Sequence, residues 1–495
     1  MQITTQPSNK KTHEDQLASF LGMSFQDPNA FALGKQQVDG RSYPRQQLAI
    51  ILDEYNRQIG NDTTALDNIK KLGLPDSYCV VTGQQLGMMG GPIYTILKGI
   101  SCLLVALETG AIPIFWLATE DHDIPEIDHT YLIDTLGNLK QFHLSLPRHG
   151  SAIEDLTLTE KNIDEIKAFW NHLGLTPIAL PSQGDLYSKS MAQILMHIFA
   201  GTGMVFLEPK LLRSLSKPFF AKELKECEAI QDVLKETTLQ LEKDGGHPGI
   251  KIGEATNLFY RDNSHKRQKL RFDGKVFTAG KEHFTLDELL LKVENETHLF
   301  SCNVAARPVL QNTLLPVIAY IAGPSEVEYH RQLGVYHQFH GAAMPCIVPR
   351  VSATFIPAYA ASILEACNLQ PWNKIPRHWP DVMPELEEGS KSMKTEWLES
   401  AKRNFGADLP ASALERYIKF GAAKILYRVC RKRLHKKGLP GNGLHLLRNL
   451  IHPHNKPQER VLNWWCFQAN SRENLVHECL GKLSWNSQTH YYLYL

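Results

Sequence analysis

The sequence predicts an α/β fold, because two distant segments each have the order of strand, glycine-containing loop, helix and strand. In the first segment, the apolar run 78–82 enters a glycine-rich loop, and a helix-forming stretch extends from Pro92 to about Glu108. A second apolar run, 111–118, then ends in the ionisable residues 120–123. Open α/β sheets bind ligands at the carboxyl ends of their strands, which is where these polar residues stand.

The second segment repeats this order. An apolar run that begins at Leu315 ends in Gly323-Pro-Ser-Glu326, and a helix-like stretch continues to Phe339. Another apolar run then leads from Met344 to Arg350. Two such βαβ units predict a single site built between two halves of one sheet.

The composition is that of an ordinary soluble protein with two or three domains. The 495 residues are 43% hydrophobic and 21% charged, and the formal net charge of +1 gives no reason to expect nucleic acid or a membrane surface as a partner. The chain has no signal-peptide pattern at its start, and no apolar run approaches the ~20 residues that cross a bilayer. Nine scattered cysteines without a CxxC pair predict free thiols in a reducing compartment. We therefore expect a cytoplasmic protein.

Three regions are expected along the chain. Residues 1–360 form the core, with insertions at about 131–300. Residues 361–455 form a helical arm, and the aromatic-rich segment 456–495 packs on the core. An antiparallel helical arm of this kind favours a dimer. Its apolar residues recur at helical spacing, at Leu414, Tyr417, Ile418, Ile425, Leu426 and Val429.

The arm also carries a run of basic residues. Arg428 to Lys437 contains six arginines and lysines, which is one pattern of a nucleic-acid-binding surface. The run lacks interleaved aromatic residues and a binding motif, so a solvated helical face is the favoured interpretation. We expect small-molecule partners and no nucleic acid.

The glycine loop of the first unit is a candidate anion site. Backbone N–H groups in such a turn can approach an anion, and the dipole of the following helix adds to the attraction. Gly90 and Gly91 stand directly before Pro92, and Tyr94 and Lys98 share one helical face. Lys98 could therefore hold a phosphate or carboxylate. The spacing matches neither a Walker loop nor GxGxxG, and tight packing beside a surface lysine is the alternative.

Four ionisable residues follow the second strand: Glu120, Asp121, His122 and Asp123. Such crowding costs electrostatic free energy, which a catalytic base, a magnesium site or a clamp for an amine would each explain. The alternative is a cluster at a helix N-terminus, where acidic side chains match the dipole. Zinc is not favoured, because it usually takes more His or Cys ligands.

Polar residues flank the second unit as well. Arg307 and Gln311 could reach a carboxylate or phosphate, with Asn303 to orient it, although on its own this is only a polar loop. Glu326 either caps its helix or binds a substrate amine, and Tyr329 lies one turn later. Arg350 stands at the end of the next strand.

Together these motifs resemble the BshC family of bacillithiol biosynthesis. The matching stretches occur in order from about residue 78 to 463. They are Val81-Thr-Gly-Gln-Gln-x-Gly, Gly90-Gly-Pro-x-Tyr-Thr-x-x-Lys98, Phe115-Trp-x-Ala-x-Glu-Asp-His-Asp123, Asn303-Val-x-x-Arg-Pro-x-x-Gln311, Gly323-Pro-x-Glu326, Pro349-Arg350 and Pro457-Gln-Glu-Arg-Val-Leu-Asn463.

The resemblance implies a Rossmann-like core with connecting insertions and a coiled-coil arm that forms a homodimer. It also implies a ligase that adds cysteine to the amine of glucosaminyl-malate. ATP is the expected activator of the cysteine carboxylate, with Mg²⁺ as a further candidate and no resident metal site. Catalysis falls to Glu120, Asp121, His122 and Asp123. Substrate or anion binding falls to Gly83, Gln84, Gln85, Gly90, Gly91, Tyr94, Lys98, Trp116, Asn303, Arg307, Gln311, Gly323, Glu326, Tyr329 and Arg350.

The sequence departs from the family pattern in places. Ser325 stands where a second glycine is expected, Glu208 stands where aspartate is usual, and the arm is shorter and more basic than the typical one. Three alternatives follow: action on a related amino sugar or another amino acid, a synthetase or nucleotidyl-transfer reaction, and a dimeric ligand-binding protein without catalysis.

Overall fold

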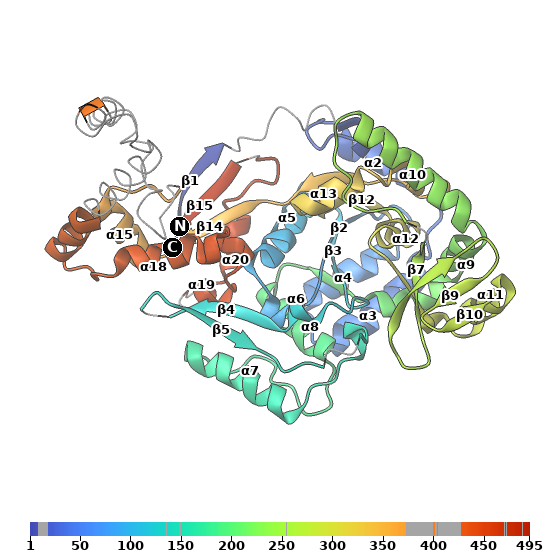
Figure 1. The fold of residues 1–495 in the computed structure, drawn as a ribbon, viewed down its shortest axis with the longest axis horizontal. Coiled ribbons are helices and arrows are strands. Elements are labelled where there is room, and N and C mark those ends of the chain that lie inside the picture. The colour runs from blue at the N-terminus through green and yellow to red at the C-terminus, as the bar shows by residue number, and fades with distance from the viewer. Residues whose placement is uncertain are drawn as a thin grey trace.

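The computed structural model describes residues 1–7, 18–134, 136–147, 150–253, 255–372, 399–400, 403, 427–469, 471, 473–487 and 489–495. Its centre is a five-stranded parallel sheet (Figure 1). In spatial order the strands are β13 (Cys346–Pro349), β12 (Val317–Ala322), β2 (Cys79–Gln84), β3 (Ile112–Leu117) and β6 (Val205–Leu207). Strands β3 and β12 are buried along their whole length, which explains their continuous apolar sequences.

The strand order reverses at the centre of this sheet. From β2 the chain passes through α5 (Ile93–Thr109) to β3 and then β6, and it returns to β12 on the other side of β2. Helices α13 (Pro324–His330) and α14 (Gly334–Phe339) then lead to β13. Open α/β sheets bind ligands at such a reversal, here between β2 and β12. The predicted α/β fold and its two βαβ units are confirmed.

Three helices precede the sheet in the chain. They are α2 (Ala30–Asp39), α3 (Arg45–Gln58) and α4 (Thr63–Leu72). Helix α2 packs on β12, whereas α3 and α4 contact β6 at the opposite edge. Residues of the sheet alternate between two apolar cores, so that Val80 and Phe115 belong to one core and Val81 and Trp116 to the other.

Two insertions interrupt the central sheet. The first, between β3 and β6, contains α6 (Ile124–Ile127), the hairpin of β4 (His129–Ile133) and β5 (Leu139–His143), α7 (Glu160–Leu173) and α8 (Tyr187–Ile198). The second lies between β6 and β12. Because β6 pairs with β3, the predicted insertion at about 131–300 also includes one strand of the core sheet.

The second insertion carries its own antiparallel sheet, which we call the inserted sheet. Its spatial order is β10-β9-β8-β7-β11. The elements are α9 (Lys217–Lys225), α10 (Cys227–Lys243), β7 (Ala255–Arg261), β8 (Arg267–Phe272), β9 (Phe277–Ala279), β10 (Glu282–Phe284), α11 (Leu286–Asn295) and β11 (Phe300–Cys302). Helix α12 (Ala306–Leu314) leads from it back to the central sheet.

A third sheet joins three distant parts of the chain. Strand β15 (Thr489–Tyr494) lies between β1 (Gln2–Pro7) and β14 (Ser352–Ile356). Figure 1 shows the N and C labels beside these strands. Further α-helices near this sheet in the chain are α15 (Ala358–Cys367), α18 (Gly443–Ile451), α19 (Trp465–Gln468) and α20 (Leu475–Leu480).

Most of the predicted arm lies outside the described residues, including Leu414, Tyr417, Ile418, Ile425 and Leu426. Residues 427–436 are helical, and Val429 is 37% exposed there. The coiled coil and the dimer therefore stay predictions. All nine cysteines are described and are free thiols, as expected. Across the described stretches, no helix combines the length and apolar character needed to span a bilayer.

Candidate active site

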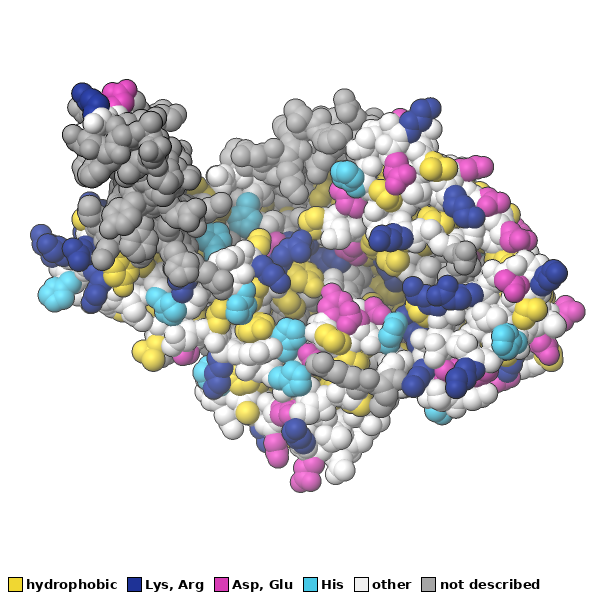
Figure 2. Space-filling model, viewed as in Figure 1, with side chains coloured by type: hydrophobic (Ala, Val, Ile, Leu, Met, Phe, Trp, Pro, Cys, Tyr) yellow, Lys and Arg dark blue, Asp and Glu magenta, His cyan; other side chains and the backbone are white. Residues whose placement is uncertain are grey.

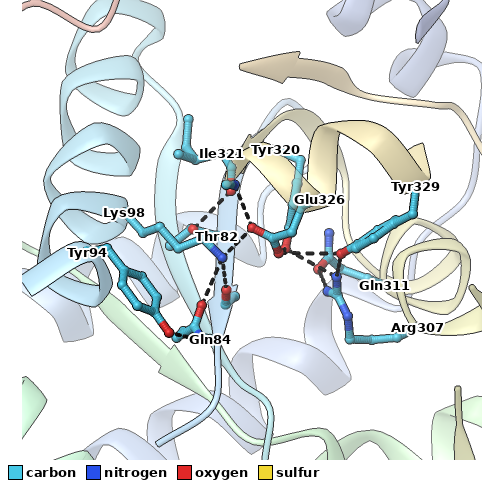
Figure 3. Close-up of polar contacts among 12 residues, drawn as sticks. Thr82, Gln84, Tyr94, Lys98, Arg307, Gln311, Tyr320, Ile321, Glu326 and Tyr329 are labelled. Carbon is cyan, nitrogen blue, oxygen red and sulfur yellow. Dashed lines mark hydrogen bonds and ion pairs between the residues drawn. The ribbon is translucent and has the colours of Figure 1, made fainter. Parts of the chain in front are cut away.

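A buried ion pair joins the two βαβ units at the carboxyl ends of β2 and β12. Lys98 of α5 and Glu326 of α13 point toward one another (Figure 3), and Nζ of Lys98 pairs with Oε2 of Glu326. The same Nζ donates to the backbone oxygen of Gly83 at 2.6 Å and to Oε1 of Gln84 at 3.1 Å. The Lys98 side chain is only 3% exposed, so the alternative of a surface lysine is wrong.

Burial and the partner's charge shift the pKa of each member of this pair in opposite directions. Burial lowers the pKa of Lys98, although the carboxylate of Glu326 favours the ammonium form. Burial alone would raise the pKa of Glu326, but the charge of Lys98 and hydrogen bonds from Lys98 and Gly323 hold it below its usual value. The N–H of Gly323 donates to Oε2 of Glu326 at 2.6 Å, so Glu326 does cap its helix.

Arg307 extends this cluster from α12. Its Nη2 donates to the hydroxyls of Tyr329 at 3.0 Å and Tyr320 at 3.2 Å, and its Nη1 donates to Oε1 of Gln311 at 3.3 Å. The Tyr320 hydroxyl in turn donates to Oε1 of Glu326 at 2.9 Å. The predicted residues Arg307, Gln311, Glu326 and Tyr329 therefore form one network with Lys98 (Figure 3).

Asn303 positions the helix that carries Arg307. Its Oδ1 accepts hydrogen bonds from the N–H groups of Ala305 and Ala306, both at 2.9 Å, at the start of α12. Its Nδ2 donates to Oδ1 of Asn257 at 3.2 Å. The polar atoms of Asn303 are thus used within the protein, and a direct contact between Asn303 and a ligand is not supported.

Glu120 is a buried carboxyl surrounded by charge. Glu120 is only 6% exposed, and burial raises the pKa of its carboxyl to about 7. The guanidinium of Arg213 opposes this shift, whereas the carboxylate of Glu154 adds to it. Nη2 of Arg213 lies 3.6 Å from Oε1 of Glu120 and 2.7 Å from Oε1 of Glu154. Near neutral pH, Glu120 can therefore both accept and release a proton.

Asp121 is held in the ionised state instead. Burial would raise its pKa, but the charge of Arg267 and hydrogen bonds from the His122 backbone N–H and from Gln85 hold it far below the usual range. Nε2 of Gln85 donates to Oδ2 of Asp121 at 2.5 Å, and the His122 N–H donates to Oδ1 at 2.8 Å. Neighbouring carboxyls with opposite shifts suit a division into proton carrier and fixed charge.

The cluster at 120–123 shows no capping hydrogen bond from Asp123. Asp123 stands at the N-cap of α6, which has only 4 residues. Among the residues with described positions, no group of three or more His, Cys, Asp and Glu side chains is arranged to hold a metal ion. The magnesium interpretation therefore gains no support.

The glycine loop is a packed turn rather than an open anion cradle. Gly90 and Gly91 have positive φ angles of 91° and 70°, and their N–H groups donate to the backbone oxygens of Gly87 and Met88. A Cβ on Gly87 would lie 2.8 Å from the Cα of Gly91, so only glycine allows this close approach. The alternative interpretation combined tight packing of the loop with a surface lysine. The structure agrees with the tight packing.

Asn463 closes the same turn from the C-terminal segment. Its Nδ2 lies 3.2 Å from the Met89 oxygen, 3.1 Å from the Gly91 oxygen and 3.0 Å from Oγ1 of Thr130. Because the N–H groups of Gly90 and Gly91 donate to backbone oxygens of the turn itself, they are not free to bind an anion here. These two N–H groups are thus not available to the phosphates of ATP.

Two further predicted binding residues are used elsewhere. Trp116 is fully buried in the core beneath the sheet, so its predicted contact with a ligand is not supported. Arg350 pairs with Glu459 at 2.5 Å and donates to the Val351 oxygen at 2.9 Å, so its charge is matched within the protein. Its guanidinium also lies 5.7 Å from the ring centre of Tyr94, whose hydroxyl accepts from Gln84.

Sequence reasoning missed several residues of the site. Arg213 and Glu154 sit in segments with no motif, and Arg267 belongs to the inserted sheet. Tyr320 lies inside an apolar strand, and the only signal for it is a hydroxyl in an otherwise aliphatic run. Figure 2 shows one face of the molecule, viewed as in Figure 1, with a hollow near its middle and basic and acidic side chains around the hollow.

Comparison with known proteins places these residues in a family. A model described as "Bacillithiol biosynthesis BshC, N-terminal Rossmann-like domain" matches residues 7–351. Three similar proteins carry the name "Putative cysteine ligase BshC". The protein from Koribacter versatilis is 30% identical over 465 residues, which are 87% of this chain and 86% of the relative. The protein from Heliobacterium modesticaldum is 33% identical over 383 residues, 71% and 70% of the two chains.

The third relative covers still more of the chain. It comes from Bacillus cereus and is 28% identical over 501 aligned residues, 93% of each chain. The matched family domain includes the cluster at 120–123, the Lys98–Glu326 pair and Arg307, and it spans well over half of the chain. The chain therefore belongs to the BshC family, with a Rossmann-like domain at residues 7–351.

Proposed function

We propose that this protein is a cytoplasmic ligase that joins cysteine to the amine of glucosaminyl-malate and so forms bacillithiol. The observation that carries the proposal is the family match over residues 7–351, because this range contains the whole buried network at the switch point. The names of the relatives support a cysteine ligase. The nine free thiols agree with a reducing compartment.

Glu120 is proposed as the proton acceptor. An amine attacks a carboxyl carbon only after it has lost its ammonium proton, so amide formation needs a base that works near neutral pH. Burial brings the pKa of Glu120 to about 7, the range in which general bases are most effective. Asp121 remains a fixed negative charge that can attract the ammonium form of the substrate.

Arg307 is proposed to hold a substrate carboxylate. The groups that accept its hydrogen bonds, Tyr320, Tyr329 and Gln311, are neutral. Its charge can therefore be complemented by the malate or by cysteine, and Arg–carboxylate contacts are the stronger kind of hydrogen bond. Lys98 and Glu326 are assigned a supporting role, because each already has a charged partner.

The reaction is proposed to depend on ATP, since a free carboxylate is a poor acyl donor. None of the described site residues is assigned to the nucleotide, because the N–H groups of Gly90 and Gly91 are bonded within the protein. No catalytic step is assigned to the nucleotide for the same reason.

A labelled-substrate assay tests the proposal. Purified protein is incubated with glucosaminyl-malate, ¹³C-labelled cysteine and MgATP, and both the thiol product and the nucleotide product are analysed by mass spectrometry. We expect a labelled amide whose formation requires all three substrates and is lost in Glu120→Gln. Nucleotide turnover without the amide would favour the nucleotidyl-transfer alternative. Tight binding of glucosaminyl-malate without any turnover would favour the non-catalytic alternative.

Profiling of low-molecular-weight thiols in cells provides the physiological counterpart. Cells that lack the protein should lose bacillithiol and accumulate glucosaminyl-malate. Restoration by the wild-type chain but not by Glu120→Gln would tie the thiol to this site. Loss of a different amino-sugar thiol would redirect the proposal to a related acceptor.

A further inference from the structure

The contacts of Arg267 bear on which ring nitrogen of His122 carries the proton. Nη1 of Arg267 lies 3.2 Å from Nδ1 of His122. An arginine guanidinium has only donors, so Nδ1 must offer its lone pair in this contact. A neutral imidazole that accepts at Nδ1 carries its proton on Nε2. As a hydrogen bond, the contact therefore requires the Nε2–H tautomer of His122.

The side chain of Arg267 is held by several contacts with the inserted sheet. Its Nε donates to Oγ of Ser301 at 3.0 Å, and its Nη2 donates to the backbone oxygen of Cys302 at 2.7 Å. The guanidinium also lies 3.7 Å from the ring centre of Phe259, and the side chain is 9% exposed. Strands β7, β8 and β11 thus all contribute to its position, and the guanidinium has little freedom to turn away from His122.

Asp121 competes for the same nitrogen. Its Oδ1 lies 3.4 Å from Nδ1 of His122 and 3.6 Å from Nη1 of Arg267. If the imidazole carried its proton on Nδ1, the carboxylate could accept it. Each tautomer of His122 therefore has a partner next to Nδ1, the guanidinium of Arg267 or the carboxylate of Asp121.

We propose that Arg267 is a positioning residue that keeps His122 in the Nε2–H form, so that the imidazole presents a hydrogen-bond donor to an oxygen of the substrate. Both contacts are made at Nδ1, so Nε2 is not engaged in either of them. The His122 side chain is 41% exposed, which leaves it accessible to a ligand. This role rests on the proposed function. In it, Glu120 accepts the proton of the substrate amine, and His122 donates a hydrogen bond to a substrate oxygen.

Nuclear magnetic resonance of ¹⁵N-histidine-labelled protein tests the tautomer directly. Long-range ¹H–¹⁵N spectra distinguish the protonated from the unprotonated ring nitrogen, and His122→Asn identifies the signals of His122. We expect Nε2–H in the wild type and a shift toward Nδ1–H in Arg267→Met, which removes the donor but keeps an apolar stem against Phe259. Arg267→Lys retains a donor and should restore Nε2–H in part. Arg271→Gln, an exposed site on the same strand, should change nothing.

The outcomes separate this inference from the proposed function. Nδ1–H in the wild type, or an unchanged tautomer in a folded Arg267→Met, would overturn the inference even if the enzyme is active. If Arg267→Met does not fold, the wild-type tautomer and the Arg267→Lys spectrum decide. In the ligase assay, kcat of Arg267→Met should fall by roughly 10²-fold, the typical effect of losing one preorganised donor, while KM changes little. Absence of ligase activity in the wild type would contradict the proposed function and leave the tautomer result standing.

Discussion

Lys98 shows that the structural role of a charged residue depends on its burial. The i, i+4 spacing with Tyr94 indicates a shared helical face, but it does not reveal that nearly the whole of α5 is buried. A signal exists in the sequence, because Lys98 is the only basic residue in the largely apolar range Ile93–Thr109. A lysine in such a helix requires a buried acidic partner, and Glu326 supplies one from more than 200 residues away.

Removal of Lys98 should therefore destabilise the protein. Lys98→Met leaves Glu326 as a buried carboxylate without its ammonium partner, and breaking a buried pair in this way typically costs about 3–5 kcal/mol. We expect that loss in the free energy of unfolding measured with urea. The double variant Lys98→Met/Glu326→Gln should recover a large part of it. Lys70→Met removes an exposed ion pair with Asp67 and serves as the control, with a change within about 0.5 kcal/mol.

Glu120 should give both activity and stability a characteristic pH dependence. Between about 4.5 and about 7, the folded protein retains a proton on Glu120 that the unfolded chain has released, so stability falls as the pH rises through this window. At about 1.4 kcal/mol for each unit of pKa, the total is roughly 3 kcal/mol. Unfolding measured across this window should show the slope in the wild type and lose it in Glu120→Gln.

Whereas stability falls as the pH rises from about 4.5 to about 7, the activity should rise over this range. A base must be deprotonated to act, so kcat/KM should rise with an apparent pKa near about 7. A rate that does not change between these pH values would contradict the assignment of Glu120 as the base.

At the scale of elements, the strands and helices of the two βαβ units were predictable because each has a strong local pattern. The apolar runs of β2, β3 and β12 are continuous, and glycines mark the turns that follow β2 and β12. The inserted sheet gave weaker signals, since β9, β10 and β11 have only 3 residues each. The contact between Arg267 and His122 joins positions 145 residues apart, and no local pattern reports such a distance.

The turn after β2 should depend on Asn463 for its stability. Asn463→Asp replaces an N–H donor by a negative charge that faces the backbone oxygens of Met89 and Gly91. Leaving buried polar groups unpaired costs about 1–3 kcal/mol each, so we expect at least that loss in denaturant unfolding. Asn171→Asp places the same change on an exposed helical position and should be nearly neutral. Equal effects of the two variants would contradict the role of Asn463.

At the scale of the whole molecule, the predicted dimer needs a measurement in solution. The apolar stripe at Ile418 and Ile425 lies outside the described residues, so the structure does not test it. A projecting helical hairpin has few surfaces other than a second copy to cover such a stripe. We expect the wild type to sediment at twice the chain mass of 56.0 kDa and the variant Ile418→Glu/Ile425→Glu to sediment as a monomer. A wild-type monomer at micromolar concentration would contradict the prediction.

The strand order of the third sheet has a consequence for synthesis of the chain. Strand β15 lies between β1 and β14, yet it is the last of the three to leave the ribosome. Until then, two strands made much earlier have no partner, and unpaired strand edges are sites of aggregation. The Rossmann-like domain can begin to fold during translation, but this sheet closes only when residues 489–494 become free. A nascent chain halted before β15 is therefore a natural substrate for chaperones.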